Sequence, residues 1–173
     1  MIAKKFITGT YTDLYQLTMG QVYFLEGYSN KQAVFDYFFR KLPFDGGYAV
    51  FAGLHDLLET LQGIHFSDDD IDYLKSLQLH PDYLKYLKTF RFTGNIFSSA
   101  EGDLIFPTRP VLRVEGNIIE AQLIETFLLN ILNFQSLIAT KASRMRLVAG
   151  KKVLAEFGLR RAQGLGGYHA SRA

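Results

Sequence analysis

Two adjacent arginines near the end of the chain have side chains suited to binding anions. Arg160 and Arg161 stand in the segment KKVLAEFGLRRAQG, just after an apolar stretch. That stretch, Val153 to Phe157, predicts a short strand that runs into a loop rich in glycine and arginine. A guanidinium group presents a planar fork of N–H donors that pairs bidentately with carboxylate or phosphate oxygens. The loop is therefore a candidate anion site, and the alternative for each arginine is a solvated charge or a surface ion pair.

Three other groups of residues lack the spacing that their chemistry requires. The consecutive acids Asp68, Asp69 and Asp70 face different sides of a helix, so we interpret them as charges at a helix start. Gly164 to Gly167 is too short for a phosphate-binding or dinucleotide fingerprint and predicts a permissive turn. No two histidines have the spacing of metal ligands on one helix; the four are His55, His65, His80 and His169. We therefore expect no metal site in this chain.

The first half of the chain predicts helices around one aromatic strand. In TDLYQLTMGQVYFLEGYS, apolar residues such as Leu14 and Leu25 recur at helical spacing. This predicts a helix from about Asp13 to Gly27, with Asp13 or the threonine before it as the cap. The segment QAVFDYFFRKL alternates in the manner of a strand and ends in a basic pair that begins with Arg40. Three further helices are predicted at 51–61, at 68–77 after Ser67, and at 81–90 from Pro81.

The second half predicts short strands followed by two helices. Glycine and proline punctuate short β-type runs between residues 91 and 116, which predicts a compact β unit. A helical period then returns and predicts one helix from Ile118 to Asn133 and a second from Phe134 to Ala149. The predicted fold class is therefore mixed, α+β or α/β.

Composition excludes several classes of protein. The 173 residues are 48% hydrophobic and 21% charged, which is typical of a folded, water-soluble chain. A net charge of +2 is too balanced to predict binding to nucleic acid. There is no cysteine, so we do not expect a secreted domain held by disulfides. There is also no apolar run long enough to span a membrane, so we expect a protein of the cytoplasm rather than of the membrane.

Three stretches of the sequence carry a family resemblance. They are TDLYQLTMG near the N-terminus, VEGNIIEAQLIETFLLNILNFQSLIATKASRMR in the middle and EFGLRRAQG near the end. In this order and spacing they resemble the nicotinate phosphoribosyltransferase family, which is similar in turn to nicotinamide and quinolinate phosphoribosyltransferases. The resemblance implies an enzyme that joins nicotinate to phosphoribosyl pyrophosphate in NAD biosynthesis and salvage, with ATP and Mg²⁺ as helpers.

The resemblance also implies roles for particular residues. Phe157 would stack on one face of the nicotinate ring, and Tyr15 of the partner subunit on the other; the alternatives are a core residue at a strand end and a helix residue packed on its own domain. Arg160 and Arg161 would jointly bind the nicotinate carboxylate and the phosphoribosyl phosphates. Arg40 matches a family position that reaches phosphate across the dimer interface. Asp13 would orient the Tyr15 helix or touch the ligand, but as a plain helix cap it needs no function; these expectations cover Asp13, Tyr15, Arg40, Phe157, Arg160 and Arg161.

The implied architecture is a homodimer with shared active sites. Residues 1–136 would form an N-terminal mixed α/β domain of hammerhead type, and residues 137–173 the beginning of an irregular α/β barrel. The histidine that the family phosphorylates would lie beyond residue 173, so the 173-residue chain is expected to be inactive alone. Two alternatives remain: a non-catalytic nucleotide-binding or regulatory module of the same fold, and a nicotinamide or quinolinate phosphoribosyltransferase.

Overall fold

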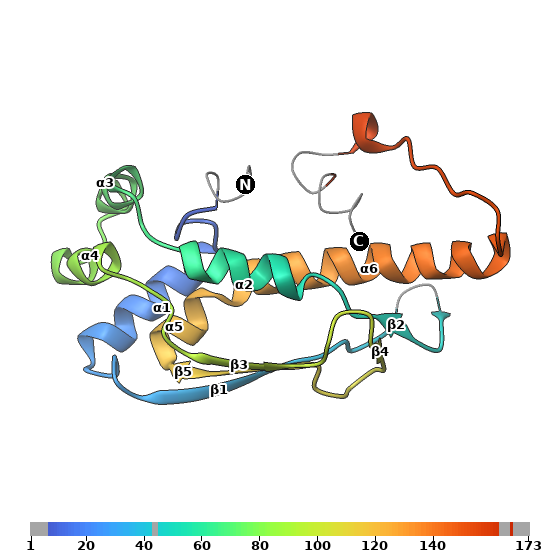
Figure 1. The fold of residues 1–173 in the computed structure, drawn as a ribbon. Helices are drawn as coiled ribbons and strands as arrows, with labels where there is room; N and C mark the ends of the chain where they lie inside the picture. Colours follow the sequence, from blue (N-terminus) through green and yellow to red (C-terminus); the bar gives the residue numbers. More distant parts are fainter. Residues whose placement is uncertain (1–6, 43–44, 163–166, 168–173) are drawn as a thin grey trace.

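The computed structural model describes residues 7–42, 45–162 and Gly167 as a mixed α/β fold (Figure 1). Its strands form a three-stranded antiparallel sheet in the order β1–β5–β3 and a two-stranded sheet, β2–β4. The strands are β1 (Gln32–Tyr37), β2 (Ala49–Val50), β3 (Asn95–Ser98), β4 (Leu104–Ile105) and β5 (Leu112–Asn117). The helices are α1 (Leu14–Leu25), α2 (Leu54–Gly63), α3 (Asp68–Ser76), α4 (Pro81–Lys88), α5 (Ile118–Leu123) and α6 (Glu125–Ala149), with a short 3₁₀ helix, η3 (Leu159–Arg161).

Local signals in the sequence set where the short helices begin. Ser67 accepts a hydrogen bond from the Asp70 amide, and the Asp70 carboxylate accepts from the Ser67 amide, so that α3 starts with a capping box. Pro81 occupies the first turn of α4, where its missing N–H is not needed. Both helix starts confirm the prediction from the sequence. The acids at 68–70 are helix-start charges, as expected.

One face of the three-stranded sheet is covered by helices and the other is not (Figure 1). The strand predicted in this segment is confirmed as β1, although it ends at Tyr37 rather than at the basic pair and its burial does not alternate: the neighbours Val34 and Phe35 are both exposed. Phe35 pairs with Val114 of β5 on the covered side, where α5 packs against both strands. On the bare side, Arg113 of β5 forms an ion pair with Asp36 at 2.8 Å. The hydrophobic core therefore lies between the sheet and the helices.

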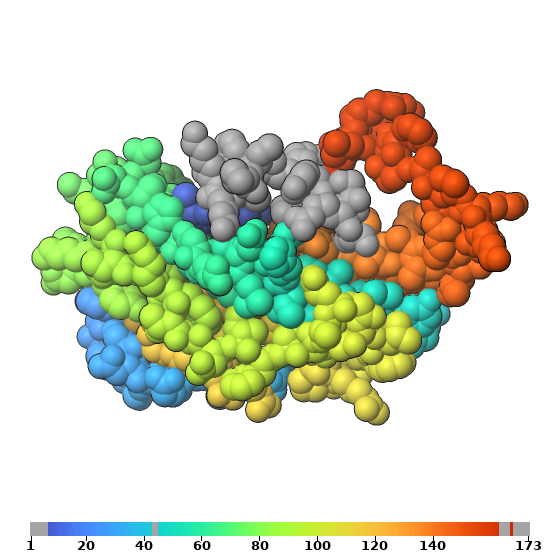
Figure 2. All heavy atoms as spheres, in the orientation of Figure 1, coloured from blue at the N-terminus to red at the C-terminus, as the bar shows by residue number. Residues whose placement is uncertain are grey.

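The structure corrects two predictions for the C-terminal part of the chain. The sequence predicted one helix up to Asn133 and a second from Phe134. In the structure the boundary lies at Ile124, between α5 and α6, and α6 continues without interruption through residues 133 and 134. The strand predicted from Val153 to Phe157 is absent: these residues are extended but pair with no strand among the described residues. A strand needs a neighbour to receive its hydrogen bonds, and Val153 is 91% exposed. Figure 2 shows this segment standing away from the body of the molecule.

None of the helices in the described part of the chain is both long and apolar enough to cross a membrane.

Candidate functional site

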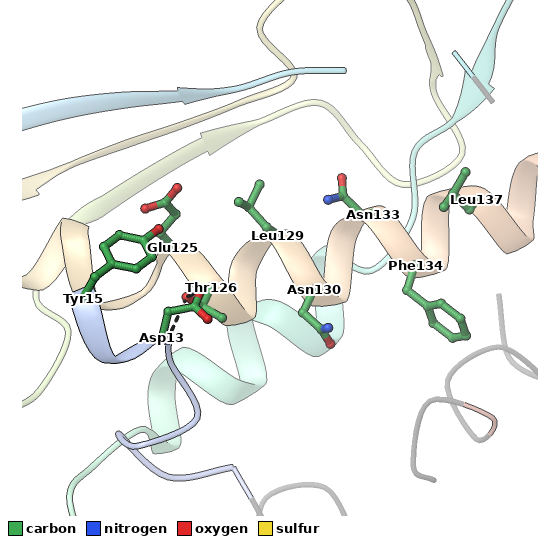
Figure 3. Close-up of a pocket in the computed structure, with 9 residues that line it drawn as sticks. All are labelled: Asp13, Tyr15, Glu125, Thr126, Leu129, Asn130, Asn133, Phe134 and Leu137. Atoms are coloured by element: carbon green, nitrogen blue, oxygen red, sulfur yellow. Dashed lines mark hydrogen bonds between the residues drawn. The ribbon is translucent and has the colours of Figure 1, made fainter. Parts of the chain in front are cut away.

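A groove runs along one side of α6, starting at the first turn of α1 (Figure 3). Its volume is about 430 Å³. The α6 residues that line it form two neighbouring rows, each with a spacing of four residues along the helix (Figure 3). The lining residues are Asp13, Tyr15, Glu125, Thr126, Leu129, Asn130, Asn133, Phe134 and Leu137.

Two tyrosines fix the amide groups of the groove. The Tyr37 hydroxyl of β1 donates to Oδ1 of Asn133 at 2.9 Å, and the Tyr11 hydroxyl donates to Oδ1 of Asn130 at 3.2 Å. Burial raises the pKa of Tyr37, so its hydroxyl keeps the proton that it donates. Each bond uses the carbonyl end of an amide, so the NH₂ end is still available as a donor.

Asp13 ties the start of α1 to the start of α6. It occupies the cap position of α1, as predicted, but its side chain makes no capping hydrogen bond to the helix. Instead the Thr126 hydroxyl donates to Oδ2 of Asp13 at 3.0 Å (Figure 3). The backbone N–H of Asp13 donates back to the same hydroxyl oxygen at 3.3 Å. These two hydrogen bonds link the start of α1 to the first turn of α6.

Tyr15 lies at the α1 end of the groove with half of its surface exposed. Its exposed fraction is 51%, so the packed-residue alternative describes only half of the side chain. Partial burial and the nearby carboxylates of Glu125 and Asp13 raise the pKa of Tyr15, and a hydrogen bond from Gln16 opposes them. The phenol is therefore neutral at physiological pH.

A buried glutamine beneath Tyr15 is the main feature that sequence reasoning missed. Gln16 is fully buried, whereas Leu14 and Leu25, which the helical pattern places on the inner face, are 54% and 51% exposed. The buried residues of α1 are Gln16, Leu17 and Gly20, and of these the helical pattern predicted only Leu17. The only signal was the glutamine itself, a polar residue in a largely apolar helix, and its partners on other helices, Gln122 and Glu125, lie more than a hundred residues away.

The remaining predicted site residues do not join Tyr15 within one chain. Phe157 is 75% exposed, and Arg40, Arg160 and Arg161 are exposed as well. None of these four has a ring contact, ion pair or side-chain hydrogen bond to another residue in the described ranges. Arg160 and Arg161 lie in η3, after an extended segment rather than at a strand end. Of the turn predicted at 164–167, residues 164–166 lie outside the described residues.

The N-terminal groove coincides with a region of recognisable sequence. Residues 10–133 match the sequence model described as the nicotinate phosphoribosyltransferase (NAPRTase) N-terminal domain. The chain belongs to the nicotinate phosphoribosyltransferase family. Asp13 and Tyr15 fall within the matched range, while Phe157 and the two arginines of η3 follow it.

Named members of this family are similar in sequence to most of this chain. The nicotinate phosphoribosyltransferase of Bacillus subtilis is 51% identical over 153 residues, and that of Caenorhabditis elegans is 47% identical over 167. These alignments cover 88% and 93% of this chain but only 31% and 30% of the relatives. The chain therefore spans about a third of the length of the curated relatives that it matches.

Two solved structures have folds similar to that of this chain. The crystal structure of human nicotinic acid phosphoribosyltransferase superimposes with a TM-score of 0.84 at 41% identity, covering 92% of this chain and 33% of the human chain. A nicotinate-nucleotide pyrophosphorylase from Pyrococcus furiosus superimposes with a TM-score of 0.69 at 24% identity, which is a likeness of fold. The mixed α/β architecture is thus shared with a nicotinate phosphoribosyltransferase of known structure.

Proposed function

We propose that this chain is the N-terminal part of a nicotinate phosphoribosyltransferase that forms nicotinate mononucleotide and pyrophosphate from nicotinate and phosphoribosyl pyrophosphate. The observation that carries the proposal is the family match, which includes Asp13 and Tyr15 and most of the groove that they line. The reaction would serve NAD biosynthesis and salvage. The absence of cysteine from the sequence agrees with the reducing cytoplasm, where we propose that it takes place.

The transfer breaks the bond between the anomeric carbon of the ribose and pyrophosphate while the ring nitrogen of nicotinate attacks that carbon. A site for it must hold a flat aromatic anion, bind phosphate oxygens and stabilise the departing charge. Tyr15 and Phe157 would stack on the ring, each contributing about 0.5–1.5 kcal/mol beyond burial. The exposed guanidinium groups of Arg160, Arg161 and Arg40 would meet the carboxylate and phosphates.

The separation of Tyr15 from Phe157 supports a site built by two subunits. Within one chain these rings make no contact, yet both have the exposed surface that a ligand needs. We propose that Tyr15 of one protomer faces Phe157 and the η3 arginines of another in a homodimer. The domain of hammerhead type at 1–136 and the barrel beginning at 137 are parts of the same proposal, with α6 passing through the boundary.

ATP and Mg²⁺ are the helpers that the family resemblance implies. In residues 7–42 and 45–162, no three histidine, aspartate or glutamate side chains gather closely enough to hold a metal ion. We propose that ATP and Mg²⁺ bind to parts of the enzyme that follow this chain, and we derive no step through them.

An assay of product formation tests the proposal. Nicotinate mononucleotide would be measured with and without ATP, using the 173-residue chain and a longer protein that continues it to the length of the relatives. We expect ATP-stimulated product from the longer protein and none from the chain alone. Product from neither would refute the activity. If calorimetry then showed micromolar binding of nicotinate or phosphoribosyl pyrophosphate, a non-catalytic module would be the better description.

A further inference from the structure

Gln16 joins three helices beneath Tyr15. Its amide nitrogen donates to the Tyr15 phenol oxygen at 2.8 Å and also to the carboxylate of Glu125, the first residue of α6. Its carbonyl oxygen accepts a hydrogen bond from the amide nitrogen of Gln122 in α5. Both N–H donors and the carbonyl of Gln16 are therefore in use, although the side chain is fully buried.

This arrangement allows the Gln16 amide only one orientation. A carboxylate such as Glu125 only accepts hydrogen bonds, and the NH₂ group of Gln122 only donates them. Flipping the Gln16 amide would turn oxygen toward oxygen and nitrogen toward nitrogen. The donor that reaches Tyr15 is thus held in place by two partners on other helices, α5 and α6.

Packing alone does not require a glutamine at this position. A buried amide loses its hydration and recovers the cost only through its hydrogen bonds, whereas an apolar side chain of the same size would fill the space without that cost. The residues around Gln16 on the inner face of α1, such as Leu17, show the apolar alternative. The glutamine is therefore better explained by what its amide holds than by the volume it fills.

Gln16 holds Tyr15, whose side chain is half exposed and has few neighbours to fix its rotamer without this hydrogen bond. A hydrogen bond to the phenol oxygen restrains the side-chain torsions of Tyr15 and leaves the phenol proton free to point elsewhere. We propose that Gln16 is a positioning residue, which fixes the Tyr15 ring at the end of the groove so that its free face is ready to stack on nicotinate. This inference rests on the proposed function. Preorganisation of this kind lowers the cost of binding the substrate, so it acts on KM more than on kcat.

A double-mutant cycle in the longer, active protein tests the proposal. Gln16→Met keeps the length of the side chain and removes all three hydrogen bonds; Tyr15→Phe removes the bond to the phenol from its exposed side. We expect each variant to raise KM for nicotinate by roughly two- to tenfold, the effect of one hydrogen bond, with kcat within about twofold. The double variant should bind nicotinate no more weakly than Gln16→Met alone, because the bond between Gln16 and Tyr15 that Tyr15→Phe removes is already lost in Gln16→Met. Additive effects, or an unchanged KM for Tyr15→Phe, would overturn the proposal.

A spectroscopic measurement on the 173-residue chain separates this inference from the proposed activity. With ¹³Cζ-labelled tyrosine, the phenol titration of Tyr15 is followed by NMR and assigned by its loss in Tyr15→Phe. The Gln16 bond stabilises the phenolate, while the carboxylates of Asp13 and Glu125 disfavour it. We therefore expect a higher pKa for Tyr15 in Gln16→Met; an unchanged pKa would refute the positioning role, whether or not the longer protein is active.

Gln21 supplies a matched control on the same helix. Its side-chain oxygen accepts a hydrogen bond from the His80 amide at 2.6 Å, away from Tyr15. Gln21→Met should therefore leave both the KM for nicotinate and the pKa of Tyr15 unchanged. If it shifted them as much as Gln16→Met does, the effects would reflect a general loosening of α1, and the positioning role would fall.

Discussion

The phenol oxygen of Tyr83 in α4 occupies the space that a β-carbon on Gly20 of α1 would need. Tyr83 is fully buried, and its hydroxyl has no hydrogen-bond partner among the described residues. Its ring packs beside Tyr86 and Phe24, with centroid separations of 6.1 Å and 5.7 Å. The glycine is thus what allows α1 to approach α4 so closely.

We predict that Gly20→Ala lowers the free energy of unfolding by about 1–3 kcal/mol through overpacking. The loss should occur although alanine favours a helix by roughly 1 kcal/mol over glycine. Tyr83→Phe removes a buried hydroxyl that has no partner, so it should cost nothing and should rescue Gly20→Ala. Urea denaturation of both single variants and the double variant measures this.

Gly63 offers the control for this prediction. It lies in the last turn of α2, and a β-carbon there would meet nothing within 4 Å. Gly63→Ala should therefore be neutral or stabilising. A Gly20→Ala variant as stable as Gly63→Ala would show that Tyr83 yields to the methyl group.

Arg161 should affect substrate binding without affecting stability. The side chain is exposed and has no ion pair or side-chain hydrogen bond within the described part of the chain, so folding does not depend on it. If it pairs with the nicotinate carboxylate in the longer enzyme, Arg161→Ala should raise KM for nicotinate about tenfold or more. Initial-rate kinetics test this beside an unchanged unfolding midpoint. An unchanged KM would reject the assignment to the carboxylate.

Thr126 should matter through its hydroxyl rather than its volume. That hydroxyl donates to the Asp13 carboxylate and accepts from the Thr12 hydroxyl at 3.2 Å. Thr126→Val has almost the same shape but leaves these groups without a partner, and should lower the free energy of unfolding by about 1 kcal/mol. Thr126→Ser keeps the hydroxyl and should retain most of the stability. Equal losses in guanidinium denaturation for both variants would contradict the prediction.

The stability that the Asp70 carboxylate contributes should be lost in acid. Burial tends to raise its pKa, but hydrogen bonds from Thr10, Ser67 and Thr8 outweigh this and hold the pKa below the ordinary value for an aspartate. The carboxylate therefore contributes stability above about pH 4, the unfolded value, and loses it as the pH falls through the lower folded value. Asp70→Asn should be less stable than the wild type at pH 7, and the difference should shrink toward pH 3.

Asp69 gives the comparison in the same turn, because Asp69→Asn removes an acid without removing those hydrogen bonds. Thermal unfolding at several pH values measures both variants. A constant difference between the wild type and Asp70→Asn across the range would show that the charge of Asp70 contributes nothing.

Much of the local structure could be predicted because its causes lie within a few residues. The side chains that form the capping box, Ser67 and Asp70, are three positions apart, and the aromatic and β-branched residues of QAVFDYFFRKL indicate the strand β1. The same approach failed at Val153 to Phe157, where the residues favour a strand but no neighbouring strand accepts their hydrogen bonds. It also placed a helix boundary at residue 133, inside α6, whereas the boundary between α5 and α6 lies at Ile124.

The candidate site was predictable only in part. The motif TDLYQL singled out Asp13 and Tyr15, and the structure places both in one groove. Thr126, which binds Asp13, and Glu125, which binds Gln16 next to Tyr15, could not be predicted because they lie more than a hundred residues away and look like ordinary residues at a helix start. The meeting of Tyr15 with Phe157 and the arginines stays a prediction, since it depends on a second protomer.

The sequence by itself determined the family, the helix starts and the chemical types available at the site, because motifs and caps are written in neighbouring residues. Only the tertiary structure decided which face of α1 is buried. Periodicity favoured Leu14 and Leu25, yet Gln16 is inside, since Gln122 and Glu125 satisfy an amide that would otherwise be too costly to bury. Such a choice depends on partners brought together by folding, and no local pattern in the chain records it.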